Sequence, residues 1–253
     1  MAGARDVLLV GIDDTDVVGS RGTGWRARTL AQRLRDAGWV TLGVTRHQLL
    51  VDPRIPYTSH NSSACIAVAA TRREGERIWR QAEEFPRRSS ETGSDPGLCV
   101  ASQSEATETV RAFGRRAQRE VLAQADAQNA IRGTSVLLKG LAGTSDGLIG
   151  ALAAVGLRAG GDDGRFLELG AIRELTGVAP VSEILEAGVD EVRGQDGKAL
   201  DLDARVETMN WVRPSLVLGR AVLVVERSTR GDRIWKPVGR HEPKKRGGAG
   251  DGR

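Results

Sequence analysis

The sequence predicts a mixed α/β fold, in which strands and helices alternate along one chain. An apolar run at residues 7–12 is followed by a glycine-rich loop and then by residues 25–37, where apolar side chains recur at helical spacing. The same order of strand, glycine loop and helix recurs at residues 135–155. Two such units favour an α/β architecture over an all-helical or all-strand one.

The remaining elements follow from the same kinds of pattern. Apolar segments predict strands over 40–51, 63–70, 97–101 and 165–171, and one or two more within 206–225. Helical periodicity predicts helices over 74–84, 105–128, 148–155 and 181–187. The segment 52–61 contains two prolines, which exclude regular strand pairing, so we expect a loop there, and a polar linker over 87–94.

Length and composition narrow the class of protein. A chain of 253 residues exceeds the usual size of a single core, which predicts one large or two modest domains. The net charge of +4 is compatible with an anionic partner, although an aromatic content of 4% gives no support to base-stacking modules. Cys65 and Cys99 lie in apolar runs, which indicates buried thiols. No apolar run reaches membrane-spanning length, and we expect a cytoplasmic protein without a membrane partner.

The most informative segment is the acidic motif at the end of the first predicted strand. Asp13, Asp14 and Asp16 follow the apolar run, and Gly22 and Gly24 precede the first predicted helix. Carboxylates together with substrate phosphates are typical ligands of Mg²⁺, and a glycine loop before a helix offers N–H groups to phosphates. Acids also occur in turns and helix caps, but the mutual repulsion of three of them favours a ligand site. The pattern therefore indicates nucleotide chemistry.

Four motifs resemble those of the archaeal isoleucine-tRNA 2-agmatinylcytidine synthetase family, and they occur in the family's order. They are Gly-Ile-Asp-Asp-Thr-Asp at 11–16, Arg-Ile-Pro-Tyr at 54–57 leading to Asn61, Asp-Pro-Gly at 95–97, and a glycine- and alanine-rich run at 147–156. The resemblance spans residues from about 8 to 225. It implies an N-terminal kinase-like α/β domain at 1–133, which binds ATP and Mg²⁺, then a ferredoxin-like α+β domain at 134–235. Residues 236–253 are expected to form a disordered basic tail.

The resemblance also implies a reaction. In that family, ATP is used to phosphorylate the C2 oxygen of the wobble cytidine of a tRNA, and the amine agmatine then displaces the phosphate. The catalytic and metal-binding positions implied here are Asp13, Asp14 and Asp16, with Thr23 standing at the family's phosphorylated threonine. The positions implied for ATP and phosphate are Gly11, Thr15, Ser20, Arg21, Gly22 and Gly24.

The acceptor and amine sites follow from later segments. The positions expected to bind the acceptor are Ser59, His60, Asn61, Asp95 and Gly97. The positions expected to bind an amine are Asp162, Asp163 and Glu168, although Asp-Asp-Gly at 162–164 is also a turn sequence.

The chain departs from the family in two respects. The family continues into an OB-fold and a zinc ribbon, and two cysteines cannot build a four-cysteine zinc site. The family's Lys-Thr-Arg-Gly-Asn loop is replaced by Thr-Ser-His-Asn at 58–61, which removes two cations from the substrate side.

Three hypotheses therefore stand. The first is an ATP-dependent ligase or kinase-like enzyme that modifies tRNA with agmatine, with a separate chain supplying the RNA grip. The second is an ATP-dependent kinase or ligase with a small-molecule acceptor. The third is a non-catalytic nucleotide- or RNA-binding module, which gives no reason to keep mutually repelling acids together.

Overall fold

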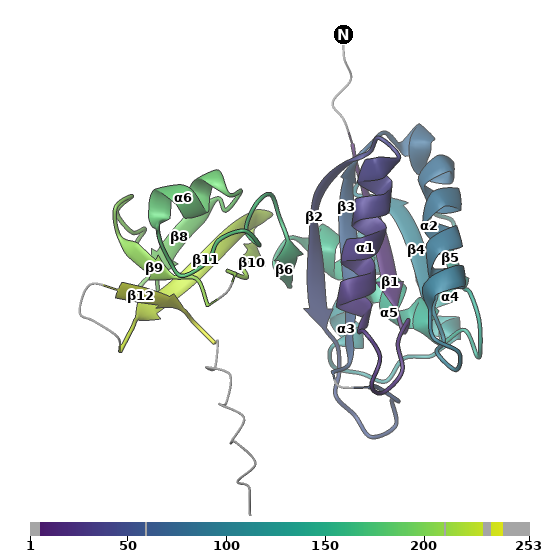
Figure 1. Ribbon diagram of the computed structural model, residues 1–253. Helices are drawn as coiled ribbons and strands as arrows, with labels where there is room; N and C mark the ends of the chain where they lie inside the picture. Colours follow the sequence, from purple (N-terminus) through teal and green to yellow (C-terminus); the bar gives the residue numbers. More distant parts are fainter. Residues whose placement is uncertain (1–5, 59, 210, 230–233, 240–253) are drawn as a thin grey trace, which may run out of the picture.

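The computed structural model describes residues 6–58, 60–209, 211–229 and 234–239. The expected mixed α/β class is confirmed, and the strands form one 12-stranded sheet in the order β5-β4-β1-β3-β2-β6-β10-β11-β12-β9-β7, with β8 paired to β11. Within the described residues, pairing is antiparallel except between β8 and β11 and between β12 and β9. Figure 1 shows two lobes, with β6 (Arg165–Glu168) between them.

The first lobe contains five strands and five helices. Its strands are β1 (Val7–Asp13), β2 (Val40–Gln48), β3 (Ser62–Ala69), β4 (Gly97–Ser102) and β5 (Leu137–Gly140). Its helices are α1 (Thr23–Asp36), α2 (Gly75–Ser89), which follows the short 3-10 helix η1 (Arg72–Glu74), α3 (Glu108–Ala117), α4 (Gln124–Ala130) and α5 (Gly147–Gly160).

The second lobe consists of short strands and one short helix. They are β7 (Val178–Pro180), α6 (Val181–Glu186), β8 (Glu191–Gly194), β9 (Arg205–Glu207), β10 (Ser215–Val217), β11 (Arg220–Arg227) and β12 (Ile234–Pro237). Apolar side chains of this lobe form a separate core around Ile172, Ile184 and Val225.

The first lobe has three layers, because side chains alternate between the two faces of its sheet. Leu8, Val10 and Ile12 of β1 belong to the core under α1 and α2, whereas Leu9 belongs to the core under α3, α4 and α5. Both sheet faces are therefore covered by helices (Figure 1). None of the helices in the described ranges is long and apolar enough to cross a bilayer.

Helix α5 lies very close to the sheet, since glycines face it. A Cβ atom on Gly11 would collide with the carbonyl oxygen of Ala151, and one on Gly97 would collide with the backbone of Gly147. Helix α5 contacts β1 and β4, and β5 pairs with β4. These contacts join residues on either side of position 134, and the division into a kinase-like and a ferredoxin-like domain stays a prediction.

Some expected boundaries were wrong. The single helix expected over 105–128 is two helices, because α3 ends at Ala117 and Asp126 accepts a hydrogen bond from the Ala123 N–H at the start of α4. Residues 87–89 continue α2 rather than starting a linker. The tail was expected to begin at 236, yet Lys236 and Pro237 belong to β12. Residues 240–253 lie outside the described ranges.

The close approach of α5 to β1 should make the stability of the fold sensitive to any side chain at position 11. We expect Gly11→Ala to lower the free energy of unfolding by about 1–3 kcal/mol, because a methyl group there must displace helix backbone. Gly160→Ala at the end of α5, where a Cβ meets nothing within 4 Å, is the control and should leave stability nearly unchanged. Urea denaturation measures both variants. Equal unfolding midpoints for the two variants would contradict the packing described.

Candidate functional site

The acidic motif turns sharply away from the sheet directly after β1. Asp13 is the last residue of β1, and Asp14 adopts a left-handed conformation with φ 48°. The Asp13 carboxylate lies against α5, where a Cβ on Gly150 would collide with its Oδ2 atom. The Asp13 side chain therefore packs against the amino-terminal turn of α5, and any side chain at position 150 would displace it.

The first two carboxylates are held in an unfavourable environment for negative charge. Burial, followed by repulsion from Asp14 and Asp16, raises the pKa of Asp13 to about 7 against a hydrogen bond from the Asp14 backbone that lowers it. Burial and then the charges of Asp95 and Asp16 raise the pKa of Asp14 to about 6. No ion pair joins either residue to a basic side chain in the part of the chain that the structure describes.

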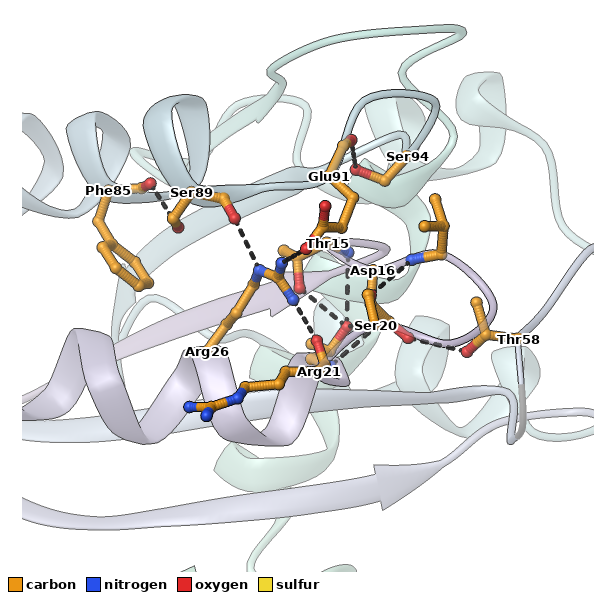
Figure 2. Close-up of polar contacts among 12 residues, drawn as sticks. Thr15, Asp16, Ser20, Arg21, Arg26, Thr58, Phe85, Ser89, Glu91 and Ser94 are labelled. Carbon is orange, nitrogen blue, oxygen red and sulfur yellow. Dashed lines mark hydrogen bonds and ion pairs between the residues drawn. The ribbon is translucent and has the colours of Figure 1, made fainter.

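The third carboxylate, Asp16, joins two segments (Figure 2). Its Oδ1 atom accepts hydrogen bonds from the Thr23 N–H at 3.1 Å and from the Thr23 hydroxyl at 2.8 Å. Its Oδ2 atom accepts one from the Thr58 hydroxyl at 2.8 Å. The Thr15 hydroxyl in turn donates to Thr23 Oγ1 at 3.1 Å. Asp16 thus fixes the start of α1 to the 52–61 loop.

A buried arginine holds the glycine-rich loop from its other side. Arg26 of α1 is 3% exposed and donates from Nε to the Ser89 carbonyl oxygen at 2.9 Å. It pairs with Glu91 at 2.7 Å and donates to the Arg21 carbonyl oxygen (Figure 2). The Arg26 guanidinium is therefore the cation that orders the glycine-rich loop. The Arg21 side chain is exposed and stacks over Trp25, with its guanidinium carbon 4.6 Å from the ring centroid.

A cavity of about 590 Å³ opens beside the acidic motif. Its polar wall includes Asp13, Asp14, Asp16, Thr23, His60 and Asn61. Its apolar wall includes Leu49, Ile55, Val121, Leu122 and Ile149. The size and the mixed lining are typical of sites for small ligands, which occupy clefts of roughly 300–1,000 Å³.

The structure thus brings together the expected catalytic residues and two of the expected acceptor residues. Gly22 and Gly24 line an adjoining cleft that shares Asp16 and Thr23 with the cavity. Ser20 accepts a hydrogen bond from the Val17 N–H within the loop. Gly11, Thr15 and Gly97 are buried, and the two glycines serve the approach of α5. Ser59 lies outside the described residues.

The other expected positions lie apart from the lining of the cavity. Asp95 accepts hydrogen bonds from the backbone and hydroxyl of Thr144, which places it in the turn before α5. Asp162 accepts from the Leu218 N–H, Asp163 pairs with the buried His47 at 2.7 Å, and Glu168 pairs with Arg35 at 2.6 Å. Each amine-binding candidate therefore has a partner within the chain, and its role stays a prediction.

Metal binding depends on which carboxylates point into the cavity. Within the described residues, no group of three or more His, Cys, Asp or Glu side chains converges as a complete ligand set. Mg²⁺ usually takes one or two carboxylates and completes its shell with waters and substrate phosphates. Asp13 and Asp14, which lack a basic partner among the described side chains, fit that partial donor set.

Several residues of the site were not predicted from the sequence. Asp146 lines the cavity at the start of α5, and its charge adds to the raised pKa of Asp14. Thr58 contacts Asp16 across 42 residues of sequence. Gly150 matters because it faces Asp13, which the spacing of a helix alone does not reveal.

No protein-family model matches the chain. No curated protein matches it either. Solved structures do match: TiaS in complex with an isoleucine tRNA and ATP is 25% identical with a TM-score of 0.50, and the match covers 60% of this chain and 36% of that one. Over this region the chain has a TiaS-like fold.

Two further solved structures agree with the TiaS-like assignment. A tRNA fluorescent labeling enzyme is 26% identical with a TM-score of 0.51, over 59% of this chain and 36% of that chain. TiaS in complex with an isoleucine tRNA, AMPCPP and agmatine is 24% identical with a TM-score of 0.50, again over 59% and 36%. These matches confirm the resemblance inferred from the motifs, and they span about a third of the length of the TiaS chains.

The raised pKa of Asp13 should make the free energy of unfolding depend on pH. Because its folded-state pKa of about 7 exceeds its ordinary 3.8, the folded protein holds more protons than the unfolded chain between these values. Protonation of Asp13 therefore stabilises the folded protein fully below pH 3.8, and this stabilisation is lost as the pH rises to about 7. We expect Asp13→Asn to raise the free energy of unfolding at pH 8 by roughly 2 kcal/mol, after allowing for solvent screening.

Urea denaturation of wild type and Asp13→Asn between pH 5 and pH 8 measures this effect, and the gap between them should widen as the pH rises. Asp203→Asn, on an exposed turn of the second lobe, is the control and should show no such widening. A gap for Asp13→Asn that stays constant with pH would contradict the raised pKa of Asp13.

Proposed function

We propose that the cavity at the end of β1 binds ATP with Mg²⁺ and activates an acceptor oxygen of a tRNA for attack by an amine. The observation that carries the proposal is the pair Asp13 and Asp14, which face the cavity with raised pKa values and without a basic partner among the described residues. A divalent cation and its phosphates would neutralise these carboxylates. The TiaS-like fold supports the reaction type, because the matched structures include complexes with tRNA, ATP, AMPCPP and agmatine.

The two walls of the cavity suit the two ends of a nucleotide. Asp13 and Asp14 would hold Mg²⁺, which when bound would neutralise charge on the phosphates. Asp16 would position Thr23 and accept its proton, because its oxygens already accept hydrogen bonds from Thr23 and Thr58. The apolar side chains Val121, Leu122 and Ile149 would pack against a flat base.

The chemistry proposed for the chain's own groups is proton acceptance and positioning. Holding Mg²⁺ would require the deprotonated form of Asp13, and its pKa of about 7 makes that form accessible near neutral pH. Thr23 donates its hydroxyl hydrogen to Asp16 at 2.8 Å. If Thr23 Oγ1 received the γ-phosphoryl group of ATP, with ADP as the leaving group, Asp16 would take the hydroxyl proton. His60 and Asn61 also line the cavity, where they would orient the acceptor.

The proposal predicts the behaviour of Asp14→Asn. We expect this variant to weaken Mg²⁺-dependent ATP binding by at least about tenfold, because one ligand oxygen loses its charge. Its thermal stability should be unchanged or higher, since a repulsion with Asp16 and Asp95 is relieved. Isothermal titration calorimetry with ATP, with and without Mg²⁺, measures the effect, and Asp203→Asn serves as the matched charge control.

Turnover of ATP by wild type distinguishes the acceptors. Stimulation by bulk tRNA together with agmatine supports the tRNA reaction, whereas stimulation by an amine or metabolite alone indicates a small-molecule acceptor. Binding of ATP without turnover under any condition indicates a non-catalytic module. If wild type binds no ATP, or if Asp14→Asn binds it as wild type does, the proposed site is wrong.

A further inference from the structure

A second cleft, of about 320 Å³, adjoins the cavity on the other side of the Asp16–Thr23–Thr58 contact. The two share Asp16, Thr23, Thr58, His60 and Ser62 in their walls. What distinguishes the second cleft is its charge. Its remaining wall includes Arg28, Arg46, Arg173, Arg213, Trp25 and Trp211, and we call it the arginine cleft.

The four arginines come from four separate parts of the chain. Arg28 is on α1, Arg46 is on β2, and Arg173 and Arg213 are in the segments that follow β6 and precede β10. All four are partly buried. Folding therefore gathers cations from both lobes at one place, which no single run of the sequence reveals.

The four arginines form no ion pairs with acids of the described residues. Among the described residues no ion pair involves any of the four, in contrast to Arg26 and Arg35, which pair with Glu91 and Glu168. Arg46 donates to the Ser62 hydroxyl at 2.8 Å and Arg173 to the Leu167 carbonyl oxygen at 3.3 Å. The Nε atom of Arg213 is buried and has no hydrogen-bond partner in the described part of the chain.

The guanidinium groups in the arginine cleft repel one another. Burial, and then the charges of Arg46, Arg173, Arg165 and Arg28, lower the pKa of Arg213. Burial and then Arg28 lower the pKa of Arg173, which the charge of Glu168 only partly offsets. Gathering uncompensated cations in a partly dry cleft costs stability, and an anion bound between them would recover it.

One aromatic ring holds two of the guanidinium groups in place. Arg173 and Arg213 both stack on the ring of Trp211, with guanidinium carbons 4.2 Å and 4.6 Å from its centroid. Stacking leaves the N–H edges of a guanidinium free to donate in its plane, which matches two oxygens of one phosphate. Stacking on one ring thus limits the orientations of two of the four guanidinium groups.

We propose that the arginine cleft binds a phosphate ester group of the acceptor, next to the atom that reacts in the cavity. In naming the acceptor, the inference rests on the proposed function. The triphosphate belongs on the Asp13 side, where a cation must accompany it, whereas the arginine cleft takes a phosphate without a metal. The cleft thereby supplies the positive charge that the 58–61 loop, with Thr-Ser-His-Asn, lacks.

The test uses the double variant Arg173→Gln/Arg213→Gln and two probes without ATP: a fluorescent single-stranded RNA that contains cytidine, and cytidine 5′-monophosphate as competitor. We expect the variant to bind RNA at least about tenfold more weakly, and its log–log salt slope to fall by about 1.4, or about 0.7 for each lost contact. Arg28→Gln, on the surface of α1, should weaken binding by a smaller factor and covers the case in which the double variant does not fold.

The matched control is Arg77→Gln/Arg80→Gln on α2. It removes the same charge and also one arginine–tryptophan stack, since Arg77 lies 4.8 Å from the Trp39 ring centroid. This control should bind RNA as wild type does. Displacement of RNA by cytidine monophosphate at similar concentrations would identify a free nucleotide as sufficient, and failure to displace would identify a phosphodiester within a strand; both support a phosphate site.

Equal RNA binding by wild type, Arg173→Gln/Arg213→Gln and Arg28→Gln would overturn the inference, as would equal weakening by the control. Calorimetry with Mg²⁺ and ATP on the double variant separates this inference from the proposed function. The variant should keep ATP binding while it loses RNA binding. If the double variant loses RNA binding but wild type binds no ATP, the phosphate cleft is supported and the proposed function is wrong.

Discussion

The close approach of helix α5 to strands β1 and β4 is the constraint on which the site depends. Gly11 and Gly97 on the sheet let the helix backbone come within contact distance, and Gly150 on the helix accepts the Asp13 carboxylate. Because the helix covers the end of β1, Asp13 is partly buried, and this burial raises its pKa to about 7. One packing arrangement thus produces both the stable core of the first lobe and the unusual protonation of its acid.

Negative and positive side chains line two neighbouring clefts near the start of α1. On one side Asp13 and Asp14 face the cavity without basic partners, and on the other four arginines face their cleft without acidic ones, within the described residues. Asp16, hydrogen-bonded to Thr23 and Thr58, lies between the two. Opposite charges that could neutralise one another are instead held apart, which costs folding energy, and we propose that ligands of both kinds offset this cost when they bind.

Much of the first lobe could be predicted from local patterns. The alternation of Leu8, Leu9 and Val10 indicates a strand covered on both faces, and the spacing in 25–37 indicates the helix that follows. The Asp13 to Asp16 motif pointed to the cavity because its residues are adjacent in the chain. The break between α3 and α4 escaped periodicity, since Val121 and Leu122 fit a helical face but lie in the loop that lines the cavity. The arginine cleft was missed for a different reason: Arg28, Arg46, Arg173 and Arg213 meet only through the pairing of β2 with β6 and of β6 with β10.

The central claim is that the carboxylates at the end of β1 hold a metal-bound triphosphate. Its most direct test is a crystal structure of the full chain grown with a non-hydrolysable ATP analogue and Mn²⁺, which is located by its anomalous scattering. We expect an anomalous peak at the Asp13 and Asp14 carboxylates, with the base against Leu122 and Ile149. A triphosphate bound among the arginines instead, or a nucleotide-free cavity at saturating concentration, would contradict it.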